Sequence, residues 1–222
     1  MGNLNFRPLW RYQDAIIEGI ITTLWLTLIA TLAGLIIGTI CAVVLRRGPK
    51  PIRYLIYTYI EVIRNTPPLI QIFIVFFVFP GFGVRLDPFP AASIALSLYF
   101  GAYASEIIRS GLDSIPRSQV EAGHCLGLSS LQVFVHVVLG PALRNIYPSI
   151  TSQIVLVLLG TSIASQISTE ELFHTAGFID SRTFRSFEVY ALIALIYVLL
   201  VTAFRLLFAL IGRVAFRWPT RR

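Results

Sequence analysis

The longest charge-free run of the sequence, residues 19–45, constrains the fold more than any other feature. An α-helix needs about 20 mainly apolar residues to cross the hydrocarbon layer of a membrane, and this run exceeds that length. Across the chain, 56% of the residues are hydrophobic and 13% are charged, whereas soluble domains have about 25% charged residues. Together these features predict an all-α protein that crosses a membrane several times.

Four further apolar segments complete a predicted set of five transmembrane helices. They cover residues 54–79, 88–111, 145–169 and 189–212. The intervening run at 131–143 is also apolar, but it is too short to cross a membrane and contains His136 and Pro141. We therefore expect this run to lie at the interface and to lead into the fourth helix, all within a single domain, residues 1–222.

The distribution of basic residues predicts the orientation, because cytoplasmic loops are enriched in Lys and Arg. One side of the five-helix arrangement carries ten: Arg46, Arg47, Lys50, Arg53, Arg109, Arg117, Arg213, Arg217, Arg221 and Arg222. The other side carries five: Arg7, Arg11, Arg85, Arg182 and Arg185. We expect the N-terminus outside and the C-terminus in the cytoplasm. The net charge of +7 is interpreted as this topology signal and not as a nucleic-acid surface.

Small residues recur at every fourth position of the first predicted helix: Ala30, Gly34, Gly38 and Ala42. Residues four apart lie on one face of an α-helix, and small side chains there let another helix approach closely. The pattern predicts a face for helix packing or for a subunit interface. Chance in a segment rich in Ala and Gly is the alternative.

Two pairs of opposite charges interrupt the second and third predicted helices: Glu61 with Arg64, and Glu106 with Arg109. Charged side chains inside a membrane are costly, so they are usually paired or functional. If the two helices pack antiparallel, Glu61 lies level with Arg109, and Arg64 lies level with Glu106. We expect either two neutralising ion pairs or direct contact of these residues with a substrate or a gate.

The segment "RNTPPL" places Pro67 and Pro68 inside the second predicted helix. Proline removes a backbone hydrogen bond and clashes with the preceding turn. Unpaired backbone groups at membrane depth are tolerated next to protein or a water-lined cavity, and broken helices often mark a translocation path. Asn65 and Thr66 are then placed to line that path; a simple kink is the alternative.

The loop between the third and fourth predicted helices carries a series of helix-boundary signals. They are Pro116 for a first turn, a capping box of Ser118 with Glu121, a stop at Gly127, and a second capping box of Ser129 with Gln132. The signals predict a short cytoplasmic helix over about 117–128, followed by a helix that rises into the membrane. A short polar helix in this position suits docking into the groove of a partner protein.

Histidine, cysteine and nucleotide-binding patterns give no sign of an enzyme. The histidines His124, His136 and His174 are too widely spaced for a compact metal motif, and Cys41 and Cys125 are interpreted as small buried hydrophobic residues. The P-loop pattern G-x-x-x-x-G-K-[ST] does not occur in the sequence. We therefore expect no catalytic residue, no metal site and no cofactor bound by this chain.

The predicted loop helix also carries a family resemblance. The stretch "EAGHCLGLSSLQVFVHVVLGPAL", residues 121–143, resembles the EAA motif of ABC-importer permeases. Glu121, Ala122 and Gly127 match the motif, whereas Gly123 stands where a second alanine is usual. This replacement is expected to loosen the helix by about 1 kcal/mol.

Three further segments resemble the polar-amino-acid branch of these permeases, the histidine/glutamate/glutamine/arginine/opine type. They are "YIEVIRNTPPLIQIFIVFF", "GAYASEIIRSGLDSIPRSQVEAG" and "LGTSIASQISTEEL". The resemblance covers most of the chain. It implies the type I ABC importer permease fold, with five transmembrane helices and the N-terminus outside, in the bacterial inner membrane.

The resemblance further implies a binding-protein-dependent importer of polar amino acids. Its other parts would be two ATPase subunits that bind ATP and Mg, a second permease (a homodimer partner or a sister chain), and a periplasmic or lipid-anchored solute-binding protein. The residues that would couple this chain to the ATPases are Glu121, Ala122, Gly123, Gly127 and Leu128. The candidates for the translocation path or a gate are Arg64, Asn65, Thr66, Pro67, Glu106, Arg109, Thr161 and Ser162.

Other classes of function remain as alternatives. An autonomous channel or secondary carrier would favour internal inverted repeats, and the sequence shows no convincing repeat. A membrane-embedded enzyme needs a cluster of catalytic residues that the histidine spacing does not provide. An importer of another small solute would differ only in its substrate.

Overall fold

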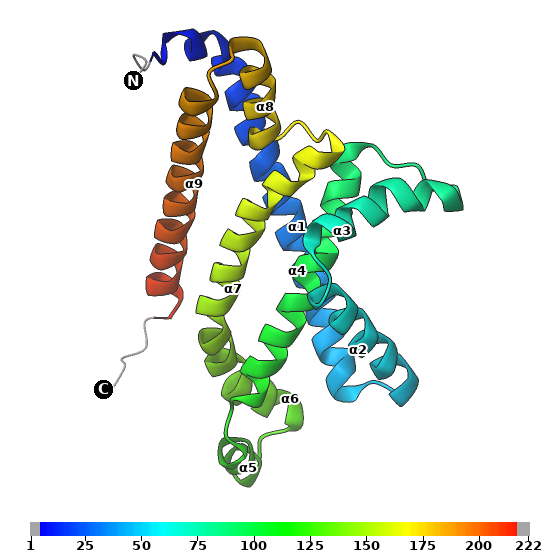
Figure 1. The fold of residues 1–222 in the computed structure, drawn as a ribbon. Helices are drawn as coiled ribbons and strands as arrows, with labels where there is room; N and C mark the ends of the chain where they lie inside the picture. Colours follow the sequence, from blue (N-terminus) through cyan, green and yellow to red (C-terminus); the bar gives the residue numbers. More distant parts are fainter. Residues whose placement is uncertain (1–4, 217–222) are drawn as a thin grey trace.

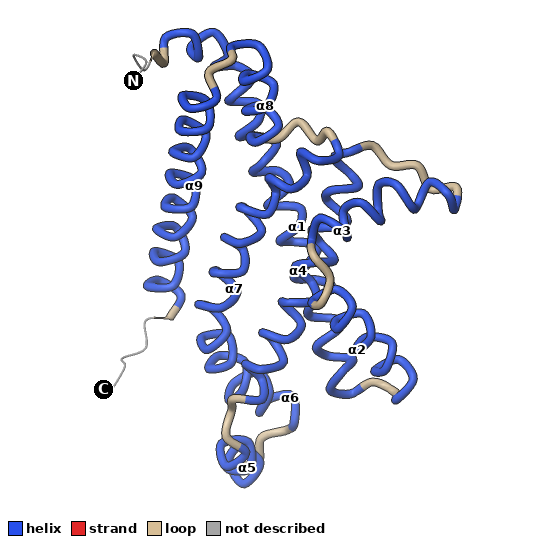
Figure 2. Tube along the Cα trace, viewed as in Figure 1, coloured by secondary structure: helices blue, strands red, loops and turns tan. Residues whose placement is uncertain are grey.

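The computed structural model describes residues 5–216, and every regular element within them is a helix (Figures 1 and 2). The α-helices are α1 (Gln13–Arg47), α2 (Lys50–Arg64), α3 (Pro68–Phe73), α4 (Pro88–Asp113), α5 (Arg117–Cys125), α6 (Ser130–Val133), α7 (Gly140–Gly160), α8 (Leu172–Thr183) and α9 (Ser186–Ala215). They are extended or joined by the 3-10 helices η1 (Arg7–Tyr12), η3 (Phe79–Phe82) and η5 (Thr161–Ile167), and by the π-helical segments η2 (Ile74–Val78) and η4 (Phe134–Leu139). The predicted all-α class is confirmed.

Four continuous helical stretches are long and apolar enough to cross a membrane. They are Arg7–Arg47, Pro88–Asp113, Ser130–Ile167 and Ser186–Ala215. A fifth candidate is the bent pair Lys50–Arg64 and Pro68–Phe82, whose two parts meet at 113°. Each of the five predicted segments overlaps one of these stretches or the bent pair.

The apolar run at 131–143 is part of the fourth stretch. It forms most of α6, then η4 and the start of α7, in a helix that is continuous from Ser130 to Ile167. Pro141 is accommodated because it lies in the first turn of α7, directly after the π-helical segment η4. The predicted orientation stays a prediction, and of the basic residues on which it rests, Arg217, Arg221 and Arg222 lie outside the described residues.

The 113° bend lies at the double proline, Pro67 and Pro68, because neither residue can donate a backbone hydrogen bond to the preceding turn. Two of the carbonyl oxygens at the break have a side-chain partner. The amide of Gln71 donates to the carbonyl oxygens of Ile63 (2.8 Å) and Thr66 (2.9 Å). Gln71 is buried, so this side chain replaces the hydrogen bonds that a broken helix in a membrane would otherwise lack.

Helices α1 and α4 pack side by side through the centre of the molecule, and the small residues of α1 form the contact (Figure 1). A Cβ atom at Gly34 would lie 2.9 Å from the carbonyl oxygen of Ser97, and one at Gly38 would lie 2.7 Å from Cβ of Ala104. The two backbones can approach this closely only because both positions are glycine. The predicted small-residue face is therefore a helix-packing face within the chain.

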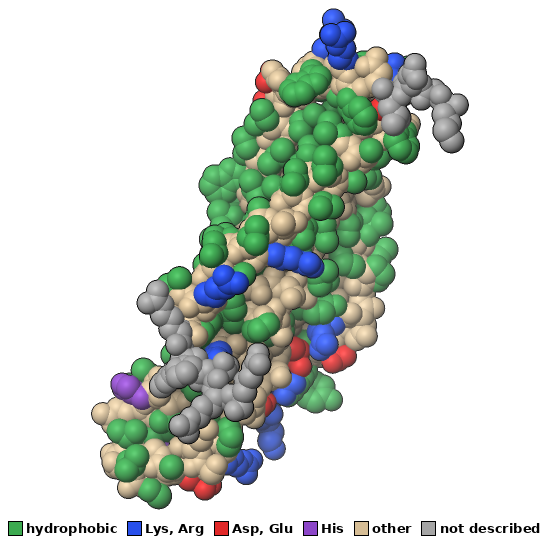
Figure 3. All heavy atoms as spheres, turned by 90° about the vertical axis from the view of Figure 1, so that its left-hand side faces the viewer, with side chains coloured by type: hydrophobic (Ala, Val, Ile, Leu, Met, Phe, Trp, Pro, Cys, Tyr) green, Lys and Arg blue, Asp and Glu red, His purple; other side chains and the backbone are tan. Residues whose placement is uncertain are grey.

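Burial differs sharply between α4 and α9. In the most apolar window, 61% of the residues of Pro88–Asp113 are buried, against 6% for Ser186–Ala215. Helix α9 packs on α8 through its first half, where Val189 and Ile193 join a cluster. It packs on α7 further along, where the hydroxyl of Tyr147 donates to the carbonyl oxygen of Phe208 (2.6 Å). Hydrophobic side chains dominate the upper half of this side of the molecule (Figure 3). An apolar surface of this kind suits contact with lipid or with another membrane subunit.

Candidate functional site

Helix α5 lies at one tip of the molecule, beyond the adjacent ends of α4 and α7 (Figure 1). It runs from Arg117 to Cys125, within the predicted range of about 117–128. The chain reverses at Gly127, whose φ of +78° is a left-handed conformation that glycine adopts without strain. The glycine stop predicted from the sequence is confirmed.

The two predicted capping boxes have different outcomes. The first is wrong: Pro116 is the N-cap residue and no side chain caps α5, because Ser118 lies inside the first turn, past the position where a side chain can cap. The second is confirmed. The backbone N–H of Ser129 donates to Oε1 of Gln132 (2.8 Å), and the N–H of Gln132 donates to Oγ of Ser129 (3.4 Å).

The outer face of α5 is exposed to solvent. Glu121, Ala122, His124 and Cys125 are all exposed, and Leu126, directly after the helix, is 81% exposed. The predicted burial is therefore confirmed for Cys41 and wrong for Cys125, which lies on the solvent face of α5. A leucine exposed to this degree at a helix end provides an apolar anchor for a partner. The residues predicted for coupling thus lie on a surface that a partner can reach, except for one.

That exception is Gly123, the buried residue of α5. A Cβ atom at this position would lie 3.0 Å from Cγ2 of Val133 and 3.5 Å from Cγ2 of Val137. The missing methyl group therefore lets α5 lie directly against α6 and η4. Glycine in place of the usual alanine lowers the helix propensity of α5, as expected from the sequence. It also allows α5 to pack closely on α6 and η4.

A cluster of charges lies where α2 meets α4. The guanidinium of Arg109 binds both oxygens of Glu106, through Nη2 to Oε2 (2.7 Å) and Nε to Oε1 (3.2 Å). Nη1 of Arg109 also lies 3.6 Å from Asp113. Arg64 of α2 reaches Glu106 at 3.9 Å and lies over the ring of Tyr103, 5.5 Å from its centroid. A carboxylate shared by two arginines links the two helices.

One of the two predicted inter-helix ion pairs is present and the other is not. Arg64 pairs with Glu106, as expected from antiparallel packing. Glu61 instead accepts a hydrogen bond from Nδ2 of Asn65 (3.0 Å), and Arg109 turns to the acids of its own helix. The prediction for Glu61 and Arg109 is wrong because partners three and four residues away on one helix face are closer than the neighbouring helix.

A polar cleft of about 580 Å³ lies beside the contact between α4 and the start of α7. Glu106 and Ser110 line it from α4, and Asn145 and Ser149 line it from α7. Nδ2 of Asn145 donates to Oγ of Ser114 (2.9 Å), the residue at which α4 ends. The cleft therefore connects the charged cluster to the segment that leads into α5.

The predicted path residues at the bend form the end of α2. Nδ2 of Asn65 donates to the carbonyl oxygen of Glu61 (2.8 Å), and Oγ1 of Thr66 donates to that of Val62 (2.6 Å). Asn65 and Pro67 are exposed. These residues adjoin Arg64 in sequence, so the bend and the charged cluster form one region.

Thr161 and Ser162 begin η5, at the end of α7 away from α5 (Figure 1), and η5 packs against α3, the helix that follows the bend. Each hydroxyl donates to a backbone carbonyl oxygen three residues earlier, at 2.8 Å for Thr161 and 2.7 Å for Ser162. Thr161 is fully buried. Of the candidate path residues, these two therefore lie on η5, beside the segment that follows the bend, and the others lie at the bend and in the charged cluster.

Sequence reasoning did not single out Glu171, which is fully buried before α8. Its carboxylate caps α8 by accepting the backbone N–H groups of Phe173 (2.9 Å) and His174 (2.7 Å), and it also accepts the hydroxyl of Tyr197 from α9 (2.9 Å). Burial raises the pKa of this carboxyl group, and the backbone hydrogen bonds partly oppose the rise. An acid directly before an apolar run was the available signal for this cap.

Comparison with known proteins places these features in a family. The chain is 42% identical over 164 residues to the L-cystine transport system permease protein TcyB of Bacillus subtilis, covering 74% of this chain and 70% of the relative. It is 31% identical over 198 residues to the glutamine transport system permease protein GlnP of Escherichia coli, covering 88% and 90%.

Solved structures show the same fold. A crystal structure described as an amino acid ABC transporter with histidines superposes with a TM-score of 0.89 at 33% identity, covering 96% of this chain and 99% of that one. An inward-facing MetNI methionine ABC transporter structure matches with a TM-score of 0.77 at 18% identity, a likeness of fold. The family model of the binding-protein-dependent transport system inner membrane component matches residues 34–216, and this chain belongs to that family.

Proposed function

We propose that this chain is the membrane-spanning permease subunit of an ATP-driven importer of polar amino acids in the bacterial inner membrane. The observation that carries the proposal is α5, a helix at the tip of the molecule whose outer face is exposed. Such a face suits a groove on a partner protein. Family membership, and similarity to permeases named for cystine and glutamine, support an ATPase partner and an amino acid substrate.

Helix α5 would receive the motion of an ATPase and pass it to the membrane helices. It joins α4 through residues 114–116 and α6 through residues 126–129, and Gly123 holds it against Val133. A displacement of α5 would therefore move α4 and α7, the two walls of the polar cleft. The proposed coupling residues are Glu121, Ala122, Gly123, Gly127 and Leu128.

The remaining parts of the transporter would be separate chains. Two ATPase subunits would bind ATP and Mg, since this chain contains no P-loop sequence. A second permease subunit, identical or a sister chain, would complete the pathway, and a periplasmic or lipid-anchored protein would deliver the amino acid. The proposed orientation places α5 in the cytoplasm.

The proposed translocation path includes the bend and the charged cluster. An amino acid carries one ammonium and one carboxylate group, so it can exchange with the contacts of Glu106 to Arg64 and Arg109. Such an exchange would open the link between α2 and α4 only when a substrate is present. The path candidates are Arg64, Asn65, Thr66, Pro67, Glu106, Arg109, Thr161 and Ser162.

The test of coupling uses the complete transporter. Glu121→Lys reverses a charge on the exposed face of α5, and His124→Ala makes a smaller change on the same helix. We expect E121K to lose its ATPase subunits during purification and to transport roughly tenfold less or worse. Because His124 lies on the same exposed face, H124A is expected to weaken the assembly less than the charge reversal does, and Glu170→Lys, the same reversal at an exposed acid outside α5, should keep its ATPase subunits. Uptake that persists in cells lacking every partner ATPase would contradict the proposal and favour an autonomous channel or carrier.

The substrate class has its own test. Calorimetry on the cognate solute-binding protein should show binding of at least one polar amino acid and none of sugars or peptides. If that protein bound another class of solute, the amino acid assignment would be wrong while the coupling result would stand.

A further inference from the structure

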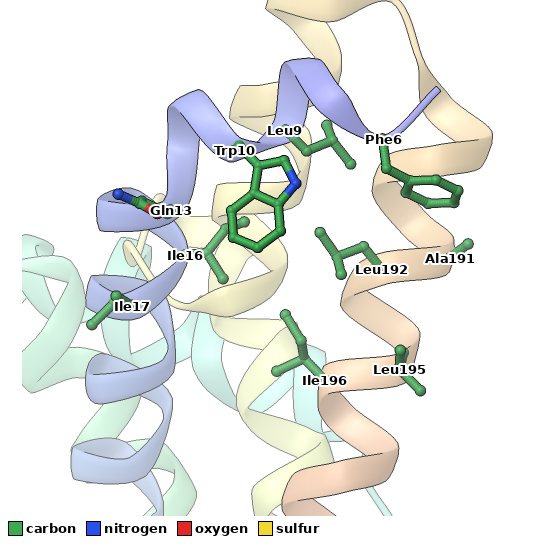
Figure 4. A pocket seen from close by; sticks show the side chains of 10 residues that line it. All are labelled: Phe6, Leu9, Trp10, Gln13, Ile16, Ile17, Ala191, Leu192, Leu195 and Ile196. Carbon is green, nitrogen blue, oxygen red and sulfur yellow. The ribbon is translucent and has the colours of Figure 1, made fainter. Parts of the chain in front are cut away.

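An apolar groove separates the N-terminal segment from the first half of α9 (Figure 4). Its volume is about 670 Å³, within the range of about 300–1,000 Å³ that is usual for ligand sites. Trp10 and Ile16 form one wall, and Leu192 and Ile196 form the other. We call this feature the N-terminal groove.

Helix η1, whose residues Leu9 and Trp10 line the N-terminal groove, carries two arginines, Arg7 and Arg11, which we call the cationic rim. Side chains three residues apart eclipse one another in a 3-10 helix, so Arg7 lies on the same face as Trp10, whereas Arg11, one residue after Trp10, lies on a neighbouring face. Both arginines are exposed, and neither has an ion-pair partner within residues 5–216. Arg185, by contrast, is bound to Glu188 at 3.0 Å. Helix η1 therefore carries two unneutralised guanidinium groups at the end of the groove that Leu9 and Trp10 line.

The groove is fixed in place by contacts of the N-terminal segment. The backbone N–H of Asn5 donates to Oε1 of Glu188 on α9 (3.3 Å), and Oδ1 of Asn5 accepts the N–H of Arg7 (3.0 Å). Leu9 is buried in the cluster that joins α8 and α9. The rim and the apolar walls are thus held at a set separation, although α1 and α9 diverge below them (Figure 1).

We propose that the N-terminal groove binds an anionic phospholipid, with one acyl chain between α1 and α9 and the phosphate group at Arg7 and Arg11. The charged residues lie at the end of the helices and the apolar walls lie toward their middle. This matches the arrangement of a charged headgroup and an acyl chain in a phospholipid. Exposed Trp10, at 72% of its surface, lies at the boundary between the two, where tryptophan is enriched in membrane proteins.

The positive charge of Arg7 and Arg11 favours a phospholipid as the occupant of the groove over a helix of a second copy of the chain. Helices α1 and α9 are the membrane-spanning candidates that form the walls, so hydrocarbon chains already surround the groove. Only an occupant with a negative group at its polar end neutralises both arginines. The bound lipid would join α9, which is poorly buried, to the start of α1.

The test measures lipid retained by the full-length chain, purified in its native assembly, with native mass spectrometry. Phosphatidylglycerol and phosphatidylcholine are added at equal concentrations. Ala191→Trp fills the groove, and Ala194→Trp, on an exposed part of the same helix outside the groove, is its matched control. The double variant R7Q/R11Q removes the cationic rim, and Arg213→Gln, at the opposite end of α9, is the control for charge.

The expected result is retention of phosphatidylglycerol in preference to phosphatidylcholine. R7Q/R11Q should weaken this preference on the order of tenfold, and A191W should abolish retention, while A194W and R213Q behave as the wild type. Equal retention of both lipids by the wild type, or unchanged retention in A191W, would overturn the proposal. So would disulfide-linked dimers of L195C in native membranes, because these would place a second copy in the groove.

Discussion

Gly123 of α5 combines a departure from the family pattern with a packing requirement. Alanine normally stabilises a helix interior relative to glycine by about 1 kcal/mol. Here the added methyl group would press against Val133, which is buried to 2% exposure. Helix propensity therefore favours alanine at this position, whereas packing against Val133 favours glycine.

The first prediction uses that opposition. We expect Val133→Ala to make room for Gly123→Ala, so that the double variant is more stable than the sum of the single effects by about 0.5–3 kcal/mol. Thermal unfolding of the four proteins in detergent measures the interaction. Independent, additive effects would show that α5 does not pack on Val133.

Glu171 is a buried acid that joins α8 to α9. It caps α8 and accepts the hydroxyl of Tyr197, and the neighbouring N–H of Leu172 donates to Oγ1 of Thr23 in α1 (3.2 Å). Because burial raises its pKa, the folded protein holds this proton to a higher pH than the unfolded chain does. The stability that it contributes is therefore present below the unfolded pKa, about 4.3, and is lost as the pH rises through the folded value.

The second prediction follows from this sign. Glu171→Gln cannot ionise, so its melting temperature should rise relative to that of the wild type as the pH increases above the unfolded pKa, about 4.3. The adjacent Glu170 supplies the control, since E170Q removes a carboxyl group that is exposed to solvent. A difference between E171Q and wild type that is constant with pH would contradict the burial of an ionisable group here.

At the scale of the elements, the contact between α2 and α4 depends on how one carboxylate is shared. Glu106 binds Arg109 of its own helix closely, at 2.7 Å, and Arg64 of the next helix loosely, at 3.9 Å. Glu106 is 23% exposed and both arginines are 39% exposed. The stronger pair is thus within α4, and the pair between helices is the one that a substrate can replace more readily.

The third prediction compares two charge swaps. E106R combined with R109E should recover more of the melting temperature and of transport than E106R combined with R64E, because only the former restores the close pair. Each single variant is the reference. Equal recovery by both swaps would mean that Glu106 does not discriminate between the two arginines.

At the scale of the whole molecule, α4 and α7 must stay in contact for a motion of α5 to reach both. Gly111 marks that contact: it is buried, and a Cβ atom there would overlap the side chain of Ile146 on α7. Gly140, at the start of α7, has no atom within 4 Å of the corresponding position. The two helical glycines therefore differ in their surroundings.

The fourth prediction uses these glycines as a matched pair. Gly111→Ala should destabilise the protein by about 1–3 kcal/mol through overpacking and should lower transport, and Ile146→Ala in the same chain should restore part of both. Gly140→Ala should be neutral or stabilising by up to about 1 kcal/mol. Similar effects of G111A and G140A on unfolding and uptake would show that α4 and α7 do not meet at Gly111.

Much of the fold could be predicted from local patterns. The five apolar segments, the break at Pro67, the stop at Gly127 and the capping box at Ser129 each depend on residues close in sequence. The capping box predicted at Ser118 is wrong because Ser118 lies two residues after the N-cap residue, Pro116, and is therefore inside the first turn of α5. Antiparallel packing of the second and third predicted helices favoured Glu61 as the partner of Arg109, whereas side-chain reach pairs Arg109 with Glu106 of its own helix.

The sequence by itself determined an all-helical membrane protein with a short polar helix between its third and fourth apolar segments, because hydrophobic length and turn chemistry are local properties. Tertiary structure alone decided which faces meet. It placed Gly123 against Val133, gave Gln71 the carbonyl oxygens of the bend, and buried Glu171 between helices. These contacts join residues of different segments or across a break, and their geometry depends on the packing of whole helices.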